Sequence, residues 1–548
     1  MNKYVYLLSF ILFSIVVNAQ QIVRGPYLQS ATPNSIKIMW RTDSATTSTI
    51  NFGSTINNLS NIVTDTNLVT DHIVLIEGLS PKTKYYYAVS LNGNILAGNN
   101  EQHHFVTNPS SNDTSKVSFW VTGDFGAKNN DQISVKRWFQ NYLTTNTVDA
   151  WLWLGDNTYD NGKDWEYQQK VFSSDFGYDS IFRFLPFYPI PGNHDYGSVS
   201  RKNNPKNDAG PYYNIVEVPK NGEAGGIGSG TETYYSYDYG TAHFLALNSE
   251  PMPYVFYKPF STELVNKDMY NFAIADLQAS TKKFNIAYWH QPPYSKGSHD
   301  SDDGWELFMK GMREEYLPIL EENGIDLILN GHSHVYERSF LINGHYNYSY
   351  YYDSTTMLID GSSGNPDLGE AYHKKTYGVS ANKGTVYAVV GNSGKKEGDN
   401  GEHHPVMFTD LSDAVGSMIL TIEGNVLTAS YYTAAGILYD KFQIIKQDTT
   451  IVNGIKPIAS IEKINVYPNP STQTLVLDIY AKQNDNINID IFDINGSLIK
   501  SNIWTNTIYS GKNTINLTNS FNELNAGIYL LSITNANNGK VVHKVVKQ

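Results

Sequence analysis

The chain contains no cysteine among its 548 residues, and this absence narrows the chemistry open to it. No disulfide can form and no thiolate can bind a metal, so any metal ion must be held by nitrogen and oxygen ligands. Basic residues are also few, because 40 Lys and Arg stand against 53 Asp and Glu and give a formal net charge of −13. Without a basic block, we expect no nucleic-acid-binding surface and no attraction to an anionic membrane.

Long apolar runs are lacking beyond the first 20 residues. There, Lys3 precedes an apolar stretch from Tyr4 to Val17, and small residues follow at Asn18 and Ala19. This is the form of a secretory signal peptide, which we assign to residues 1–20. The run is short for a membrane span, although an uncleaved anchor is the alternative. No later segment is apolar enough to cross a membrane, so we expect an exported chain with no transmembrane span after signal removal.

The length of the chain is too great for one core and predicts three or four domains. Residues 22–108 carry short alternating apolar runs separated by turn residues, which predict a small β-sandwich. Within it, the segment from Leu79 to Tyr86 resembles the turn and tyrosine strand of fibronectin type III domains. Nothing in this domain looks catalytic, and we expect a spacer or docking role.

Residues 115–446 have a different pattern, in which apolar strands alternate with amphipathic helices. The expected strands are 117–121, 150–154, 187–190, 284–289, 325–329 and 385–390, with a hairpin at 234–248 and a β region at 415–445. The expected helices lie around Val135–Tyr142 and at about 263–283 and 305–322. This order predicts an α/β sheet whose chemistry lies along one edge.

Polar residues follow several of these strands at the point where each strand ends. Taken one at a time, each has an ordinary explanation as a helix cap, a turn residue, a core histidine or a surface-loop histidine. Together in one domain they predict a metal site, because carboxylates, amides and imidazoles are metal ligands. The residues are Asp124, Asp156, Asn193, His290, His332 and His334.

The blocks around these residues resemble those of the calcineurin-like metallophosphoesterases and, more narrowly, of the purple acid phosphatases. They are Gly123-Asp124-Phe125-Gly126, Gly155-Asp156-Asn157-Thr158-Tyr159, Gly192-Asn193-His194-Asp195, His290 after a strand, and Gly331-His332-Ser333-His334. The resemblance covers roughly residues 22–446, because the family also has an N-terminal β domain. Gly126 stands where other metallophosphoesterases have a histidine ligand, and Tyr159 offers a phenolate instead, as purple acid phosphatases do.

The resemblance implies a centre of two metal ions. The first ion would be bound by Asp124, Asp156, Tyr159 and His334, and the second by Asp156, Asn193, His290 and His332, with Asp156 bridging them. A phenolate favours a trivalent ion, so the implied cofactors are Fe³⁺ and a divalent ion, which is iron, zinc or manganese. Charge transfer from tyrosinate to iron would give the protein colour.

Two histidines are implied to act on the substrate. His194 would contact the phosphate, and His299 resembles the histidine that protonates the leaving alkoxide. A surface-loop position is the alternative for His299. Asp195, which stands where many members have Glu, is a candidate for orienting His194. Arg338 is either structural or substrate-facing.

The end of the chain reads as a separate module. A polar linker spans residues 447–460, and residues 461–548 predict a small C-terminal β-sandwich. Its opening, Val466-Tyr467-Pro468-Asn469-Pro470, and its strand Gly527-Ile528-Tyr529 resemble the C-terminal sorting domain of type IX secretion substrates. This implies the type IX secretion machinery as a partner. The alternative is a carbohydrate-binding or adhesive module.

The resemblance therefore implies a multidomain chain with a fibronectin type III-like domain, an α/β metallophosphoesterase sandwich and a sorting domain. We expect an exported acid phosphatase, secreted or held at the outer cell surface after passage through the periplasm. It would hydrolyse small phosphomonoesters by metal-hydroxide attack. The alternatives are a phosphodiesterase or nucleotide-cleaving relative, because the same metal core serves both, and a non-catalytic surface-binding protein.

Overall fold

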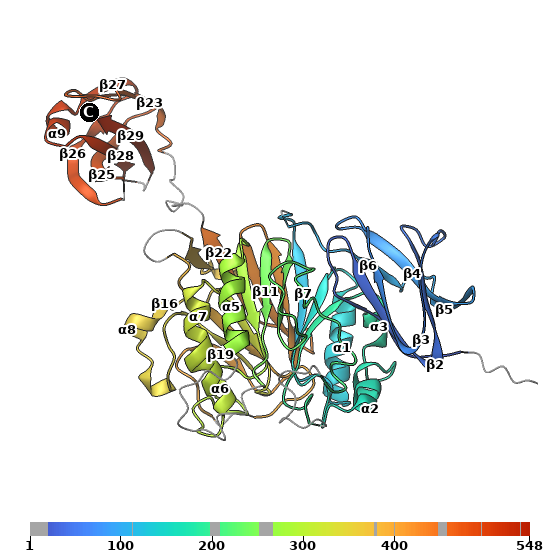
Figure 1. Ribbon diagram of the computed structural model, residues 1–548. Helices are drawn as coiled ribbons and strands as arrows, with labels where there is room; N and C mark the ends of the chain where they lie inside the picture. The colour runs from blue at the N-terminus through green and yellow to red at the C-terminus, as the bar shows by residue number, and fades with distance from the viewer. Residues whose placement is uncertain are drawn as a thin grey trace, which may run out of the picture. The chain divides into compact units, whose positions relative to one another are not determined.

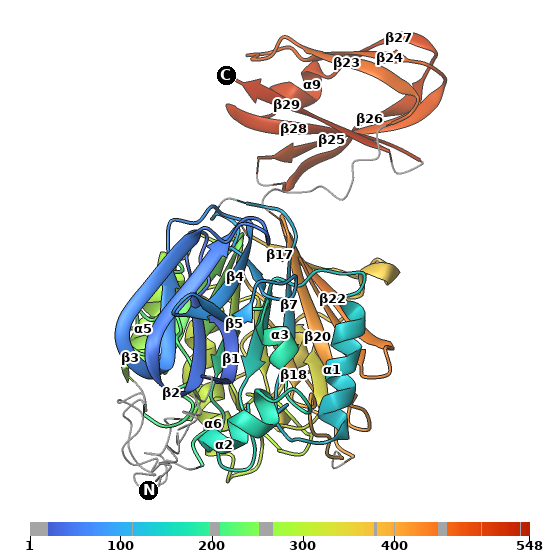
Figure 2. The same ribbon diagram turned by 90° about the vertical axis from the view of Figure 1, so that its right-hand side faces the viewer.

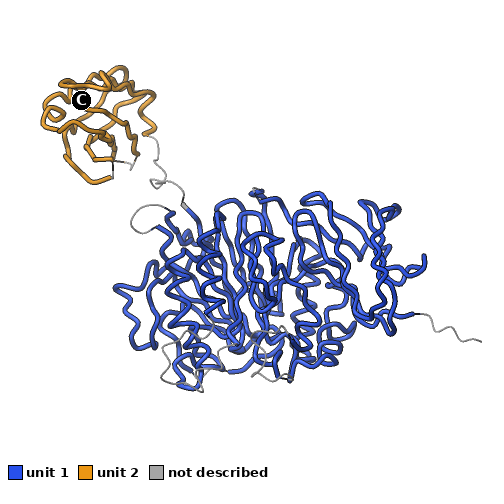
Figure 3. The backbone as a smooth tube through the Cα atoms, viewed as in Figure 1, with its two compact units in different colours: residues 1–448 blue, residues 449–548 orange. Residues whose placement is uncertain are grey.

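The computed structural model describes residues 20–111, 113–197, 209–250, 267–376, 381–398, 401–447, 458–494, 496–536 and 539–548. The expected signal peptide and most of the expected linker, residues 448–457, lie outside the described residues. The chain divides into two compact units, residues 1–448 and residues 449–548 (Figure 3). Within the described part of the chain, no helix is both long and apolar enough to cross a membrane.

The first six strands form one sheet around the longest of them. They are β1 (Ile22–Gln29), β2 (Ile36–Gly53), β3 (Asn61–Ile76), β4 (Lys84–Leu91), β5 (Asn94–Gly98) and β6 (His104–Val106). Strand β2, at 18 residues, pairs with β1, β3 and β4, and β4 in turn pairs with β5 and β6, so all six strands belong to one hydrogen-bonded sheet. The β-sandwich expected for residues 22–108 stays a prediction. The sheet encloses its own core, which includes Ile38, Trp40, Ile50 and Tyr87.

Two seven-stranded sheets make up the rest of the first unit. One has the order β17 (Tyr372–Lys375), β22 (Leu438–Gln447), β21 (Val426–Thr433), β20 (Gly416–Glu423), β7 (Val117–Thr122), β8 (Ala150–Leu154) and β9 (Phe187–Ile190). The other has the order β10 (Tyr235–Tyr239), β11 (Ala242–Ala246), β12 (Phe284–Tyr288), β13 (Leu327–Asn330), β18 (Val386–Val390), β14 (Tyr336–Ser339) and β19 (Met407–Leu411).

Side chains from both sheets share one core, so the sheets pack face to face. Phe119 and Leu152 of the first sheet lie in the same buried cluster as Phe244, Ile286 and Leu327 of the second. The strand pattern alone predicted a single sheet. A continuous apolar run predicts a strand, but it does not say which sheet that strand joins.

Helices cover the outer faces of the two sheets (Figures 1 and 2). Helix α1 (Asn130–Tyr142) packs on β7 and β8, where the rings of Phe139 and Trp120 stack at 3.8 Å. Alternation along β7 sends Trp120 to this face and Phe119 to the core between the sheets. The second sheet is covered by α5 (Lys267–Ala279) and α7 (Leu317–Glu322).

The expected helix at 305–322 is made of three pieces: α6 (Leu307–Gly311), a π-helical segment (Met312–Tyr316) and α7. Of the expected helix at 263–283, residues 263–266 lie outside the described part, and α5 is the remainder. The short elements are α2 (Asp164–Glu166), a π-helical segment (Tyr167–Val171), α3 (Asp179–Phe182), β15 (Leu341–Ile342), α8 (Ser354–Met357), β16 (Leu358–Asp360) and the 3₁₀ turns Ser349–Tyr351 and Pro366–Leu368.

The second unit is a small β structure with its own core. A three-stranded sheet contains β23 (Ile461–Tyr467), β24 (Val476–Ala481) and β27 (Gly511–Asn516). A four-stranded sheet contains β26 (Leu498–Ile508), β25 (Asp485–Asp493), β28 (Gly527–Asn535) and β29 (Lys540–Lys547), and α9 (Thr518–Asn522) lies between β27 and β28 in the chain. Leu477, Ile489 and Leu531 from the two sheets meet in one buried cluster. The multidomain, β-rich architecture predicted from the sequence is confirmed.

Candidate metal centre

Five strands deliver polar side chains to one place. Strands β7, β8 and β9 are parallel neighbours in the first sheet, and β12 and β13 are parallel neighbours in the second. Parallel strands end at the same edge of a sheet, so the residues that follow them meet there. The structure brings together all seven residues predicted as metal ligands: Asp124, Asp156, Tyr159, Asn193, His290, His332 and His334.

The first group of donor atoms surrounds the hydroxyl of Tyr159. This hydroxyl donates to Asp124 Oδ1 at 2.9 Å and lies 3.1 Å from His334 Nε2. His334 Nε2 is in turn 3.5 Å from Asp124 Oδ1. Two oxygens and one nitrogen thus lie within 3.5 Å of one another, and all three are atoms that can bind a metal ion in place of the phenol proton.

The second group surrounds the side-chain oxygen of Asn193. His290 Nε2 lies 3.2 Å from Asn193 Oδ1, and His332 Nδ1 lies 3.1 Å from the same oxygen. His290 Nδ1 donates to the Leu154 carbonyl at 2.8 Å, which leaves Nε2 as the lone-pair atom of the neutral ring. Asp156 Oδ1 is 3.3 Å from this Nε2. Acceptors therefore face acceptors, as they do around a cation.

Asp156 lies between the two groups. It is 2% exposed, and its carboxylate forms a cluster with Asp124 and His290 in which the potential ligand atoms lie within 4.8 Å of one another. Burial alone would raise the pKa of Asp156, but the charge and hydrogen bond of His290 outweigh burial and lower it. Burial would likewise lower the pKa of His290, yet Asp156 and Asp124 raise it to about 10. The centre strongly favours positive charge, either as a proton on His290 or as a metal ion.

The pKa of Tyr159 moves away from the deprotonated form in which a phenol binds a metal, just as the raised pKa values of His290 and His334 move away from their neutral, metal-binding forms. Burial and the nearby Asp124 and Asp156 carboxylates raise the pKa of the phenol well above 10. A phenolate at neutral pH therefore requires a metal ion to replace the proton, and binding of that ion will release it.

Glycines allow these donors to pack directly on the backbone. A Cβ at Gly155 would lie 2.5 Å from His290 Nδ1, and one at Gly331 would lie 2.5 Å from Asp124 Oδ2. The residues after these glycines, Asp156 and His332, have φ of 47° and 68°, a left-handed conformation that non-glycine residues seldom adopt. Such strain gathers where side chains must be aimed at a site.

Gly126 explains why the first block lacks a histidine. A Cβ at this position would lie 2.0 Å from the Asn157 carbonyl oxygen, so no side chain fits. The backbone of the second block occupies that space and brings Tyr159 to the centre from the same segment.

The donor set fits two metal ions. Asp124, Tyr159 and His334 with Asp156 supply one mostly anionic group of ligands, and Asn193, His290 and His332 with Asp156 supply a second, more neutral one. All are nitrogen and oxygen donors, which suits iron, zinc and manganese. Their assignment as ligands stays a prediction.

His194 lies beside the first group. Its backbone N–H donates to Asp156 Oδ1 at 2.8 Å, and its ring lies 4.5 Å from the ring of Tyr159. The ring is oriented by the Asp160 carbonyl, 2.7 Å from Nδ1. Asp195, the expected orienting residue, instead accepts hydrogen bonds from the Gly192 and Asn157 N–H groups. Its shorter side chain serves the turn rather than the histidine.

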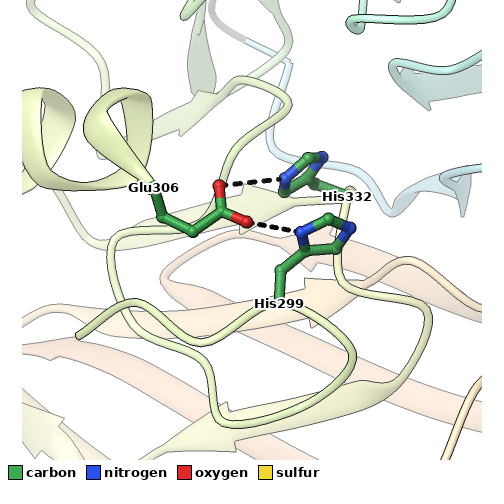
Figure 4. A group of neighbouring side chains, drawn as sticks. All are labelled: His299, Glu306 and His332. Atoms are coloured by element: carbon green, nitrogen blue, oxygen red, sulfur yellow. Dashed lines mark hydrogen bonds and ion pairs between the residues drawn. The ribbon is translucent and has the colours of Figure 1, made fainter. Parts of the chain in front are cut away.

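His299 lies beside the second group, and its partner Glu306 was not predicted (Figure 4). His299 Nδ1 is 2.6 Å from Glu306 Oε1, and the ring of His299 stacks on that of His332 at 3.9 Å. The other oxygen of Glu306 lies 3.6 Å from His332 Nε2. Burial would raise the pKa of Glu306, but the hydrogen bonds of the two histidines lower it to about 2. Glu306 is therefore an anion that holds both imidazoles.

Arg338 is structural. Its side chain is fully buried and pairs in bidentate fashion with Asp440, with Nε and Nη2 at 2.8 and 2.9 Å from the two carboxylate oxygens. The guanidinium also lies 4.4 Å from the ring centroid of Phe408. It joins β14 to β22, and its remaining nitrogen, Nη1, lies 3.0 Å from the Tyr372 hydroxyl.

Comparison with known proteins agrees with this geometry. Residues 117–336 match the calcineurin-like phosphoesterase family, residues 24–107 match the purple acid phosphatase N-terminal domain, and residues 465–548 match the secretion system C-terminal sorting domain. Residues 117–336 are therefore similar to calcineurin-like phosphoesterases. The chain also resembles purple acid phosphatases, and its match to the sorting domain indicates secretion or attachment at the cell surface.

Individual relatives are distant. Purple acid phosphatase 15 of Arabidopsis thaliana is 28% identical over 320 residues, which are 54% of this chain and 53% of the relative. Probable inactive purple acid phosphatase 9 of the same plant is 26% identical over 296 residues, 48% of this chain and 42% of the relative. The chain thus spans about half the length of these relatives. The purple acid phosphatase structure from yellow lupin (Lupinus luteus) seeds shares the fold, with a TM-score of 0.56 at 17% identity over 77% of this chain and 75% of that one.

Proposed function

We propose that this phosphoesterase is an exported acid phosphatase that hydrolyses small phosphomonoesters at a centre of two metal ions. The observation that carries the proposal is the convergence of seven donor side chains in two groups, with Asp156 between them. A relative named as probably inactive matches the chain nearly as well as one named as a phosphatase, so resemblance to these proteins does not by itself imply activity. The presence of all seven donor side chains supports catalytic activity.

The metals proposed are Fe³⁺ with Asp124, Asp156, Tyr159 and His334, and a divalent ion of iron, zinc or manganese with Asp156, Asn193, His290 and His332. The hard, anionic phenolate and carboxylates of the first set favour the higher charge. When bound, such a pair supplies a nucleophile from water near neutral pH and neutralises charge on the phosphate.

The chain's own residues position and protonate the substrate in this proposal. His194, held at Nδ1 by the Asp160 carbonyl, turns its other nitrogen toward the centre to contact the phosphate. His299, held at Nδ1 by Glu306, leaves Nε2 to give a proton to the departing alkoxide. Each histidine has one nitrogen occupied by an acceptor, which fixes its tautomer and its orientation.

Export is the remaining part of the proposal. The signal-like residues 1–20 would direct the chain to the periplasm, and the sorting domain would deliver it to the type IX machinery for release or surface attachment.

Hydrolysis of an aryl phosphomonoester and an aryl phosphodiester, compared from acid to alkaline pH on the metal-loaded protein, tests the function. We expect preference for the monoester with an acid optimum. Asp156→Asn should abolish turnover and release metal, measured by elemental analysis. The matched control is Asp160→Asn, which changes an exposed residue and keeps the backbone carbonyl that orients His194. A diester preference would assign the centre to the phosphodiesterase alternative, and metal binding without turnover of either ester would favour the non-catalytic one.

A further inference from the structure

A lysine lies over the face of the predicted tyrosine ligand. Lys395 Nζ is 4.1 Å from the ring centroid of Tyr159, whose side chain is 2% exposed. The oxygen of the same ring faces Asp124 and His334. Lys395 thus touches Tyr159 on its π face, while the predicted metal position lies at its oxygen.

The backbone that carries Lys395 is fixed on both sides. Before it, Ser393 N–H donates to the Gly123 carbonyl at 3.2 Å, and Asn129 donates to the Gly394 carbonyl at 2.8 Å. After it, Glu397 N–H donates to the His334 carbonyl at 3.2 Å. A Cβ at Gly394 would lie 2.4 Å from the Phe125 carbonyl oxygen. The segment is therefore packed against the metal-side loops and holds the lysine in place.

No carboxylate of the described residues competes for the ammonium group. Among the residues that the structure describes, no carboxylate oxygen lies within 4.0 Å of Lys395 Nζ, whereas its neighbour Lys396 turns away and donates to the Asp413 carbonyl at 2.9 Å. A cation is attracted to the negative face of an aromatic ring, and the attraction grows when the group is desolvated. A phenolate ring carries more electron density than a phenol and is attracted more strongly.

We propose that Lys395 tunes Tyr159 as a metal ligand by stabilising the electrons of its ring. The stabilised phenolate is a weaker donor, so the first metal ion keeps more positive charge and becomes a stronger Lewis acid toward the phosphate. The inference rests on the proposed function, because it takes Tyr159 as a ligand of ferric iron. In this proposal Lys395 acts only through Tyr159, so it is a positioning residue and not a catalytic residue.

The position of the absorption band of tyrosinate bound to ferric iron is a direct measure of this effect. Light moves an electron from the ring to iron, and a cation over the ring makes that electron harder to remove. In the iron-loaded, full-length protein, Lys395→Met should move the band to longer wavelength by on the order of 10 nm, the size that a cation–π stabilisation has in the visible range. Lys395→Arg keeps the cation and should leave the band near its original position. Lys396→Met is the matched control and should leave it unchanged.

The outcomes separate this inference from the proposed function. A tyrosinate band that Lys395→Met does not move overturns the inference while the metal centre stands. The same unmoved band with a higher inhibition constant for inorganic phosphate would make Lys395 a phosphate-binding group and also overturns it. Iron binding with no tyrosinate band in the unsubstituted protein removes Tyr159 from the centre and overturns both.

Discussion

At the scale of single residues, Glu306 lies between His299, the predicted general acid, and His332, a predicted metal ligand. Its two carboxylate oxygens lie 2.6 Å from His299 Nδ1 and 3.6 Å from His332 Nε2. Glu306→Gln keeps an acceptor for His299 but removes the charge, and Glu306→Ala removes both. In the proposed mechanism His299 protonates the leaving alkoxide, and alkyl phosphates need that proton more than aryl phosphates do. The kcat for alkyl phosphates should therefore fall about 10-fold to 100-fold, and the kcat for aryl phosphates should fall much less.

The measurement is kcat and KM for an alkyl and an aryl phosphate in each variant, with metal content determined alongside. Equal losses for both esters with full metal content would show that Glu306 does not act through His299. Metal loss with equal decline of both esters would restrict its role to holding His332.

At this scale, the sequence identified some residues of the metal centre and missed others. Asp124, Asp156 and His290 follow apolar strands, and a strand end is visible in a single sequence. Glu306 and Lys395 reach the centre from loops, and nothing local distinguishes them from solvated surface charges. Asp195 was expected to orient His194 because of its place in the chain, but side-chain length decides which partner it reaches, and sequence spacing does not report that.

At the scale of elements, a buried histidine joins two strands to a helix. His243 of β11 has Nδ1 2.9 Å from Asp238 of β10 and Nε2 2.7 Å from Asp276 of α5. Burial would lower the pKa of His243, but the hydrogen bonds and charges of the two carboxylates raise it from 6.5 to about 9. Among the described residues, Lys282 also contacts this group, with its Nζ 3.4 Å from Asp238 Oδ2.

The sign of the pH effect follows from that shift. Because the folded pKa lies above the unfolded value, the stabilisation is fully present below pH 6.5 and is lost as the pH rises through 9. It amounts to about 3 kcal/mol at most. Thermal unfolding of the full chain between pH 6 and pH 9.5 should show this loss, and His243→Gln should make the decline smaller by the part that His243 contributes. His403→Gln, which removes an exposed histidine paired with Asp410 at 2.6 Å, is the control and should not. An equal slope in all three proteins would contradict the assignment.

Elements with a regular period were predicted well, and irregular ones were not. The buried strands β8 and β9 begin and end where the apolar runs do, and α1 follows its i, i+3, i+4 pattern. In contrast, β2 and β3 extend to 18 and 16 residues, well beyond the short alternating apolar runs from which strands were predicted. Their polar extensions pair because the long partner strand supplies hydrogen bonds, which is a tertiary effect that local propensity does not contain.

At the scale of the whole molecule, the two compact units have separate cores. The buried clusters of the first unit contain no residue beyond Ile444, and the cluster of the second begins at Ile458. All seven predicted ligands belong to the first unit. The sequence indicated this division through its polar linker, but residues 448–457 lie outside the described part and the linker itself stays a prediction.

Separate cores predict separate stability. Deleting residues 449–548 leaves the described buried clusters of the first unit whole, and hydrophobic stabilisation depends on the area that each core buries. The shortened protein should therefore keep its kcat/KM for an aryl phosphomonoester and its metal content, and its thermal midpoint should stay within about 2 °C. The shortened protein should lose export across the outer membrane. In a host with a type IX secretion system, it should remain in the periplasm while the full chain reaches the outside. A lower midpoint or weaker metal binding after the deletion would mean that the second unit supports the first. Unchanged export would mean that the sorting domain serves adhesion or carbohydrate binding instead.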